Sequence, residues 1–415
     1  MQSNTIQRPL DGIRVLDLTV ALSGPFATLT LGGMGAEVIR LEAPGGSDIS
    51  RNNPPFITGT GISFSANKDG DMNLSTLSRA RNKKSITLDL KSKRGRELLM
   101  ALAKECDVLV ENMSEGATAR LGIDYAAMRK INPKLIYASI KAMGEPSQYP
   151  NLKGMDIIVQ ALSGIMGTTG LTDGPPTRLG IPMADLVAAQ YAANGILAAL
   201  IYRGRTGEGQ QVMVSMLDCM ASWVAVEHFD VFEKQGFPTR SGNVMNRMIP
   251  FGVYEASDGH VAIIAFQGEW FKGLMAAIGK PELVSDPRYS SVVERVHHAD
   301  EFNQILRGWT TQHTCDEIVN ELLENRGIPA AKVRSPAEIF QDPHLRSSGA
   351  ITTLAHPRYG EIDALGYGLP IQFSVSKSQF DKPAAELGAS NEEIYGELLK
   401  LSPEEIRELR FNKVI

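Results

Sequence analysis

Histidine is missing from the first half of the chain, since the first of its 7 histidines is His228. The sequence also lacks an H-E-x-x-H motif, a His pair at four-residue spacing and a G-x-S-x-G turn, which are typical of zinc and serine hydrolases. The adjacent His297 and His298 are typical of a solvated surface. We therefore expect no resident metal, and chemistry in the N-terminal half must use carboxylates, Lys, Tyr, Cys or Ser.

Cysteine and charge of one sign are scarce as well. Cys106, Cys219 and Cys315 show no paired spacing, so neither a disulfide framework nor a structural zinc site is expected. The 42 basic and 47 acidic residues leave a net charge of −5. This balance argues against nucleic acid or an anionic membrane as the main partner.

The chain has no apolar signal core near its beginning, which reads MQSNTIQRPLDG. The most apolar stretch, residues 181–202, is interrupted by Asp185, Gln190 and Asn194, and a membrane span rarely carries three such groups. We interpret this stretch as a buried helix. Together these features predict a cytoplasmic protein.

Phosphate-binding loops are also absent. The segment Gly59-Thr-Gly61 lacks the third glycine of a dinucleotide fingerprint, and Gly32, Gly33 and Gly35 come late in a predicted helix rather than at a strand-to-helix turn. No G-x-x-x-x-G-K-[ST] motif occurs. Chemistry driven by a bound nucleotide is therefore not expected.

Strand and helix patterns alternate over the first part of the chain, on either side of residues 43–82, which are expected to be loops. The expected strands are 14–19, 36–41, 85–90, 108–111 and 135–140, and the expected helices are 26–34, 95–105 and 125–130. This alternation predicts an α/β fold with a parallel sheet covered on both faces.

The pattern changes after about residue 225, where a smaller α+β domain is expected. Residues 254–266 predict a hairpin that turns at Asp258-Gly259, and helices are expected over 268–278, 300–309 and 315–325. A last helix is predicted after Ser402, because Pro403 and Glu405 complete a capping box.

Two carboxylates lie in unusually apolar surroundings. Asp156 precedes the apolar run Ile-Ile-Val-Gln-Ala-Leu, and Asp185 stands in the first turn of the helix predicted over 181–202. Free N–H groups and the helix dipole stabilise an anion at such a position. Asp185 is thus either an ordinary helix-capping residue or a nucleophile that these N–H groups hold. Composition alone leaves both interpretations open.

Basic residues cluster just before the strand expected at 85–90. The cluster comprises Arg79, Arg81, Lys83 and Lys84, and Arg120, Lys141 and Lys153 lie near other predicted loop ends. At the carboxyl ends of a parallel sheet, such groups suit a phosphorylated ligand. A solvated surface is the alternative.

Taken together, these segments resemble the class III coenzyme A transferases, the family of formyl-CoA transferase, carnitine CoA-transferase and CaiB/BaiF-like proteins. The similar segments keep the family's order over nearly the whole chain. They are residues 9–19 (PLDGIRVLDLT), 35–42 (GAEVIRLE), 81–91 (RNKKSITLDLK), 107–112 (DVLVEN), 121–124 (LGID), 132–136 (NPKLI), 170–176 (GLTDGPP), 195–200 (GILAAL), 205–210 (RTGEGQ), 327–329 (GIP) and 342–346 (DPHLR).

The resemblance implies a fold, an assembly and a site. It implies a large Rossmann-like domain from residues 1–225 and 336–415, a small α+β domain from residues 226–335, and an interlocked homodimer. It implies that Asp185 is the catalytic nucleophile and that Asp156 is an auxiliary acidic residue. The implied coenzyme A contacts are Leu22, Ser23, Arg81, Lys83, Asn112, Met113, Arg120 and Lys153.

The implied activity is transfer of CoA from an acyl-CoA donor, with succinyl-CoA a plausible one, to a carboxylic acid, with no permanently bound cofactor. Two features depart from formyl-CoA transferases: residues 242–252 contain no glycine run, and residues 57–80 form an insertion that either shapes an acid pocket or contacts a partner chain. An α-methylacyl-CoA racemase is the nearest alternative, but it requires a histidine base that the N-terminal half lacks. A non-catalytic subunit of a hetero-oligomeric CoA-transferase is the other alternative.

Overall fold

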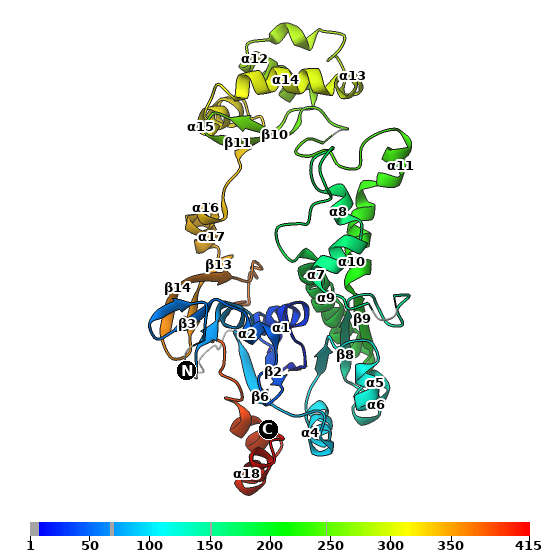
Figure 1. Cartoon of the computed structure of the whole chain (residues 1–415), viewed down its shortest axis with the longest axis vertical. Coiled ribbons are helices and arrows are strands. Elements are labelled where there is room, and N and C mark those ends of the chain that lie inside the picture. Colours follow the sequence, from blue (N-terminus) through cyan, green and yellow to red (C-terminus); the bar gives the residue numbers. More distant parts are fainter. Residues whose placement is uncertain (1–7, 67–69, 150–151, 246) are drawn as a thin grey trace. The chain divides into compact units, whose positions relative to one another are not determined.

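The computed structural model describes residues 8–66, 70–149, 152–245 and 247–415 (Figure 1). The chain divides into two compact units. The larger consists of residues 1–163, 180–223 and 340–415, and the smaller of residues 164–179 and 224–339. The chain therefore leaves the larger unit twice and returns to it twice.

A six-stranded parallel sheet forms the centre of the larger unit, in the order β6-β2-β1-β7-β8-β9. Its strands are β1 Arg14–Asp17, β2 Glu37–Glu42, β6 Lys83–Thr87, β7 Val108–Glu111, β8 Ile136–Lys141 and β9 Gln211–Ser215. The helices that precede or follow these strands are α1 Ser23–Gly33, α4 Lys93–Lys104, α5 Ala117–Leu121, α6 Tyr125–Ile131, α7 Asp156–Leu162, α9 Met183–Thr206 and α10 Met216–Val224. The fold class is the predicted one.

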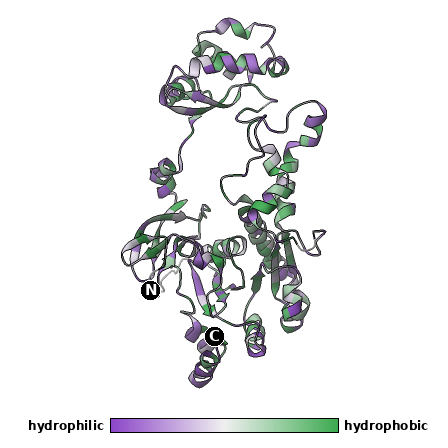
Figure 2. Cartoon of the chain, in the orientation of Figure 1, coloured by the Kyte–Doolittle hydropathy of each residue, from purple (hydrophilic) through white to green (hydrophobic). Residues whose placement is uncertain are grey.

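Both faces of this sheet are buried, because successive strand residues enter different cores. Leu16 and Ile39, which are opposite each other on β1 and β2, pack with residues of α4 and α6. Val15 and Val38 point to the other face and pack with residues of α1 and α9. Figure 2 shows hydrophobic and hydrophilic stretches along the strands of this sheet, with β6 largely hydrophilic. Burial on both faces explains the apolar residues in the middle of β1, β2 and β7.

Helix α9 is the long apolar helix that the sequence predicts over 181–202. Among the described residues, it is the one helix whose length and mean hydropathy would suit a membrane span. It packs on α1, β8 and β9. Its buried residues are Ala184, Val187, Ala188, Ala189, Ala192, Ala193, Ile196 and Ala199. This packing is that of a core helix in an α/β unit.

Residues 43–82 were expected to be loops, and this expectation is wrong. They contain α2 Ile49–Asn52, α3 Leu74–Arg79 and a three-stranded antiparallel sheet of β3 Phe56–Thr58, β4 Gly61–Ser63 and β5 Met72–Asn73. Ile57, Met72 and Leu77 form a small core with Leu354. Strands of two or three residues are too short to show an alternation of apolar and polar residues. The turn residues around them therefore gave this segment the sequence pattern of a loop.

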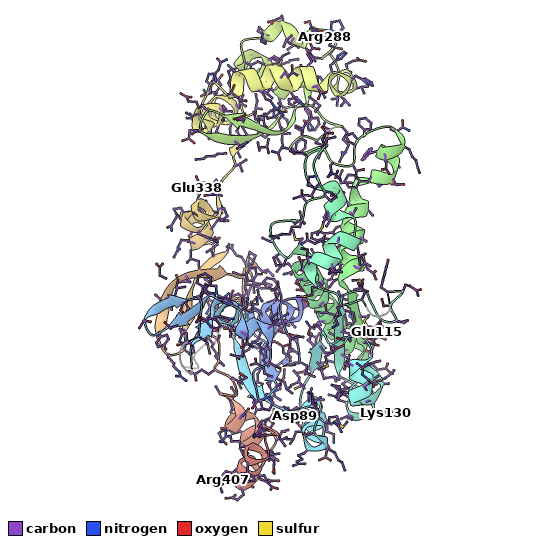
Figure 3. All side chains as sticks on the ribbon, in the orientation of Figure 1. Asp89, Glu115, Lys130, Arg288, Glu338 and Arg407 are labelled. Carbon is purple, nitrogen blue, oxygen red and sulfur yellow. The ribbon has the colours of Figure 1, made fainter. Side chains whose placement is uncertain are left out.

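The C-terminal segment of the larger unit begins at residue 340, near the end of α16 Pro336–Gln341, which is followed by α17 Pro343–Ser347. It continues with an antiparallel pair, β13 Ile351–His356 and β14 Gly360–Tyr367, the π-helical turn η4 Glu392–Leu398 and α18 Pro403–Phe411. The predicted capping box of α18 is confirmed: Ser402 accepts from Glu405 N–H, and the Glu405 side chain accepts from Ser402 N–H. Arg407 points outward from this helix (Figure 3).

The smaller unit is an α+β structure around the sheet β10-β11-β12. Its elements are α8 Ile165–Thr168, η1 Ala225–Glu227, α11 Phe229–Lys234, β10 Phe251–Ala256, β11 Gly259–Ile264, α12 Gly268–Ala277, η2 Pro281–Val284, α13 Val292–His297, α14 Ala299–Thr310, α15 Cys315–Val319, η3 Asn320–Glu324 and β12 Ala330–Lys332. The predicted hairpin is β10–β11, but its turn is at Ser257-Asp258 rather than Asp258-Gly259, because Gly259 already pairs with Ala256 as the first residue of β11. Residues 164–179, expected in the large domain, belong to this unit, and the unit continues to residue 339 rather than 335.

Candidate active site

The buried carboxylate of Asp17 stabilises the turn between β1 and α1. Asp17 Oδ1 accepts from Thr19 N–H at 3.0 Å, and its Oδ2 accepts from Thr28 Oγ1 at 2.6 Å and from Lys83 Nζ at 3.0 Å. A Cβ atom on Gly24 would lie 2.3 Å from the Thr19 side chain. The start of α1 therefore requires glycine at position 24, and its backbone is set by bonds to one carboxylate.

Three other polar side chains bond to the backbone of the same turn. Asn112 accepts from Val20 N–H and donates to Val20 O, both at 2.9 Å. Asp48 Oδ1 accepts from Ala21 N–H at 3.1 Å, and Arg79 Nη1 donates to Ala21 O at 3.1 Å. These bonds stabilise the left-handed conformation of Ala21, whose φ is +64°. Leu22 and Ser23, which follow directly, are buried.

Asp156 is a positioning residue for the start of α9. Its Oδ1 accepts from Ala184 N–H at 2.8 Å, and its Oδ2 accepts from Gln160 Nε2 at 2.7 Å. Helices α7 and α9 are in contact. The Asp156 carboxylate thus takes the free N–H group that α9 presents at its first turn.

Asp185 lies one residue further along α9 and is half-buried. Burial and the neighbouring Asp156 carboxylate raise the pKa of Asp185 to about 6, while hydrogen bonds from Ser23 and the charge of Arg79 oppose that rise. The structure therefore brings Asp156, Asp185 and Ser23 together, and it places Arg79 close enough for its charge to act on Asp185.

Asp185 is not an ordinary helix cap. The N-cap position of α9 is Pro182, and no side chain bonds to the free N–H groups from that position. The expectation that helix N–H groups keep Asp185 ionised is therefore wrong. Asp156 binds the Ala184 N–H group instead, and burial makes the Asp185 anion more basic. A carboxylate that is ionised above pH 6 and partly desolvated is suited to nucleophilic attack.

The expected coenzyme A contacts fall into two groups. Arg120, at the end of α5, and Lys153, before α7, are exposed, and Asn112 and Met113 are half-buried at the end of β7. Met113 O accepts from Lys141 Nζ at 2.9 Å. Leu22 and Ser23 present the backbone that follows the β1–α1 turn. These six positions follow the carboxyl ends of β1 and β7 or lie in α5 and the loop before α7, as a ligand site at this edge of a parallel sheet requires.

Arg81 and Lys83 form the second group, and both side chains are buried. Arg81 donates to Ser78 O, Thr352 Oγ1 and Tyr367 O, and burial lowers its pKa to about 10. Lys83 donates to Pro25 O at 2.8 Å as well as to Asp17, and burial lowers its pKa to about 8. These internal bonds favour a structural role for both residues, and direct contact with coenzyme A stays a prediction.

Two contacts of the candidate site were not identified from the sequence. Gln160 is fully buried and orients Asp156 from four residues along the same helix, a spacing that places two side chains on one face. That spacing was a usable signal. Ser23 was expected as a coenzyme A contact, but its hydroxyl and its N–H group also bond to Asp185. The sequence contains no signal for that contact, because it joins segments far apart in the chain.

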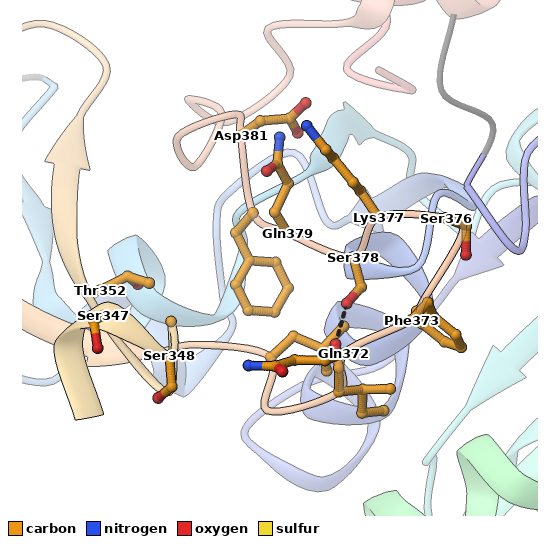
Figure 4. Close-up of a pocket in the computed structure, with 14 residues that line it drawn as sticks. Ser347, Ser348, Thr352, Gln372, Phe373, Ser376, Lys377, Ser378, Gln379 and Asp381 are labelled. Atoms are coloured by element: carbon orange, nitrogen blue, oxygen red, sulfur yellow. Dashed lines mark hydrogen bonds between the residues drawn. The ribbon is translucent and has the colours of Figure 1, made fainter. Parts of the chain in front are cut away.

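A cavity of about 690 Å³ lies elsewhere in the larger unit, among residues 347–381 (Figure 4). Ser378 Oγ donates to Ile371 O at 2.6 Å on its wall. None of the expected site residues lines it. Within the described ranges, no group of three or more His, Cys, Asp or Glu side chains is placed to hold a metal ion.

Comparisons with known proteins identify the family of this chain. The model of CoA-transferase family III matches residues 10–391. The chain is 38% identical to a succinyl-CoA:mesaconate CoA-transferase of Haloarcula hispanica, over 88% of this chain and 90% of that one. It is 32% identical to a succinyl-CoA:glutarate CoA-transferase of Mus musculus, over 98% and 90%. The crystal structure of a CaiB/BaiF family protein from Brucella suis superposes with a TM-score of 0.81 at 32% identity, covering 94% of this chain and all of that one. The chain therefore belongs to the family III CoA-transferases.

Proposed function

We propose that this CoA-transferase moves CoA from succinyl-CoA to a dicarboxylic acid through covalent intermediates on Asp185. The observation that carries the proposal is the half-buried Asp185 carboxylate, whose pKa of about 6 leaves it anionic at neutral pH, beside the N-terminus of α1. The named relatives that use succinyl-CoA with mesaconate, glutarate or citramalate support this choice of donor and acid.

The first half of the reaction loads the enzyme. The Asp185 carboxylate attacks the thioester carbonyl of the donor, the C–S bond breaks, and a mixed anhydride and CoA thiolate form. The thiolate then attacks the Asp185 carbonyl carbon, which releases the donor acid and leaves an Asp185–CoA thioester. The Ser23 N–H and hydroxyl stabilise the charge that develops on the aspartyl oxygen.

The second half of the reaction repeats these steps in reverse. The acceptor carboxylate attacks the aspartyl thioester and releases CoA thiolate, which then attacks the acyl carbonyl of the new anhydride and regenerates the Asp185 anion. One thioester replaces another, so the reaction needs no ATP and no permanently bound cofactor. Asp156 serves by holding the start of α9 in place.

Coenzyme A would lie along the edge of the sheet that carries the β1–α1 turn. Arg120 and Lys153 provide exposed cations for its phosphates, and Asn112, Met113, Leu22 and Ser23 provide the neighbouring surface. We propose a homodimer in the cytoplasm as the working form, as the family resemblance implies.

The test is to trap the intermediate. Wild-type protein is incubated with succinyl-CoA, quenched with hydroxylamine or borohydride, digested and analysed by mass spectrometry. We expect one modified peptide, which contains Asp185. Modification of Asp156 instead, or turnover with no modified peptide, would overturn the mechanism.

A further inference from the structure

The segment 43–82 brings one arginine to the active-site turn. Helix α3 is capped by Asn73, whose Oδ1 accepts from Thr76 N–H at 2.8 Å, and it ends at Arg79. Helices α3 and α1 are in contact. Arg79 is half-buried, and its Nη1 donates to Ala21 O at 3.1 Å. The insertion thus delivers a guanidinium to the turn that carries Ser23, the partner of Asp185.

Arg79 differs from the other arginines near this turn in lacking an anionic partner. Arg40 pairs with Asp48 at 2.5 Å, and Arg51 pairs with Glu42 at 2.6 Å. Across the described residues, Arg79 forms no ion pair, and its Nη1 donates to a neutral carbonyl, although the charges of Asp185 and Asp48 act on it. A guanidinium has five N–H donors. Arg79 therefore keeps N–H donors beside the nucleophile that no carboxylate within the described residues binds directly.

The chemistry of the site calls for such a cation. Asp185 and Asp156 already repel each other, and an acid substrate adds another carboxylate. A dicarboxylic acid adds two, and the second does not react. An unpaired guanidinium is the group that binds such a carboxylate with most directional specificity. Because Arg79 and Asp185 interact without forming a direct ion pair, an acid with two carboxyl groups can engage both residues.

We propose that Arg79 binds the non-reacting carboxylate of a dicarboxylic substrate whose other carboxyl group reacts at Asp185, and that it selects diacids over monoacids. This assignment rests on the proposed function. It gives the insertion at residues 57–80 a role in shaping the acid pocket. It applies equally to the free acid and to the succinyl group of the donor, because both carry the same free carboxylate.

The test compares Arg79→Gln, Arg79→Lys and wild type, with Arg94→Gln as a matched control because Arg94 is an exposed arginine that pairs with Glu97 on α4. Binding of succinate, glutarate and butyrate is measured by calorimetry at pH 8, where Asp185 is ionised. CoA transfer to each acid is measured in parallel. We expect Arg79→Gln to weaken succinate and glutarate binding roughly tenfold to hundredfold, down to the level of butyrate. Butyrate binding should not change.

The experiment distinguishes outcomes that support the inference from outcomes that overturn it. Arg79→Lys should recover part of the diacid affinity, and Arg94→Gln should match wild type. If Arg79 only supports Ala21, all three acids will weaken together in Arg79→Gln, and the inference is overturned. Unchanged succinate binding in Arg79→Gln also overturns it. If wild type instead binds no acid and transfers no CoA, the proposed function itself fails, which is a different result.

Discussion

The two units of this chain bury different kinds of side chain. Buried ionic groups lie on the strands of the parallel sheet in the larger unit: Asp17, Arg40, Glu42, Lys83, Glu111 and Lys141. The smaller unit has an apolar core, and its buried charged side chain, Arg295, donates to the carbonyls of Ile249, Tyr289 and Phe266 rather than to an anion. All three nitrogens of Arg295 are bonded in this way, whereas Arg40 Nε in the larger unit has no hydrogen-bond partner within the described residues.

The difference concerns how each unit holds its backbone. The Arg295 guanidinium joins three segments of one core through neutral carbonyls. The pairs Lys83–Asp17 and Arg40–Asp48 hold the β1–α1 turn, which lies next to the Asp185 carboxylate that we propose as the nucleophile. Buried charges are costly in themselves, so we expect the charges beside this turn to position its backbone rather than to add stability.

Asp185→Asn should have the largest effect. It preserves shape but removes the attacking anion, so CoA transfer should fall by several orders of magnitude while thermal unfolding stays that of wild type. Steady-state transfer assays and calorimetry measure the two. Asp156→Asn is the comparison and should keep a measurable rate, because Asp156 positions α9 without reacting. Near-normal turnover in Asp185→Asn would contradict the assignment.

Lys83→Met should have the next largest effect, because it leaves the Asp17 carboxylate buried without its cation. Breaking a buried pair costs about 3–5 kcal/mol, so the unfolding transition of the larger unit should move to lower denaturant concentration. The double variant Asp17→Asn with Lys83→Met should recover part of this loss.

Phe302→Ala is the control from the smaller unit. Phe302 is fully buried, and its loss should cost a similar 3–5 kcal/mol by leaving a cavity. The two variants should nevertheless differ in activity: among molecules that remain folded, Phe302→Ala should transfer CoA normally, and Lys83→Met should not. Equal activity losses would erase the contrast between the units.

The pH dependence gives an effect of intermediate size. Because the pKa of Asp185 is raised to about 6, the nucleophile is protonated below that pH and kcat/KM should fall about tenfold per pH unit there. Above pH 7, kcat/KM should no longer depend on the ionisation of Asp185. Asp156→Asn removes the repelling charge, so the fall in kcat/KM should move to lower pH. Initial rates between pH 4.5 and 8.5 test this, and an unshifted fall in Asp156→Asn would argue against the coupling.

Arg120→Ala and Lys153→Ala should show the smallest effects. Each removes one exposed cation proposed to bind coenzyme A, so the KM for acyl-CoA should rise roughly tenfold, about 1.4 kcal/mol. The KM for the acid should change less. An effect confined to the acid would reassign these residues.

Sequence patterns predicted much of the fold but little of the site's geometry. The strand expected over 108–111 is β7, and the helix expected over 125–130 is α6, one residue longer. Those elements are set by apolar periodicity, which neighbouring residues report. The small sheet within 43–82 was missed because its strands are too short for that signal.

Site residues were predicted by type more easily than by role. The absence of histidine before His228 limited the chemistry of the N-terminal half to carboxylates, Lys, Tyr, Cys or Ser, and Asp156 and Asp185 were both candidates. Their roles depend on contacts: Asp156 binds Ala184 N–H, and Ser23 bonds to Asp185. The wrong expectation about the pKa of Asp185 arose because a helix N-terminus is visible in sequence, whereas burial and a neighbouring anion are not.

The sequence by itself determined the parallel sheet, the β10–β11 hairpin and the capping box at Ser402, because each depends on residues close together in the chain. Only the tertiary structure decided that Asp156 accepts a hydrogen bond from the start of α9, that Lys83 pairs with Asp17, and that Arg79 donates to the turn before Ser23. The physical reason is that a charged group takes its partner from whatever segment folding brings near, and 58 residues separate Arg79 from Ala21. Coulomb and hydrogen-bond energies depend on distance in space, and chain spacing carries no record of it.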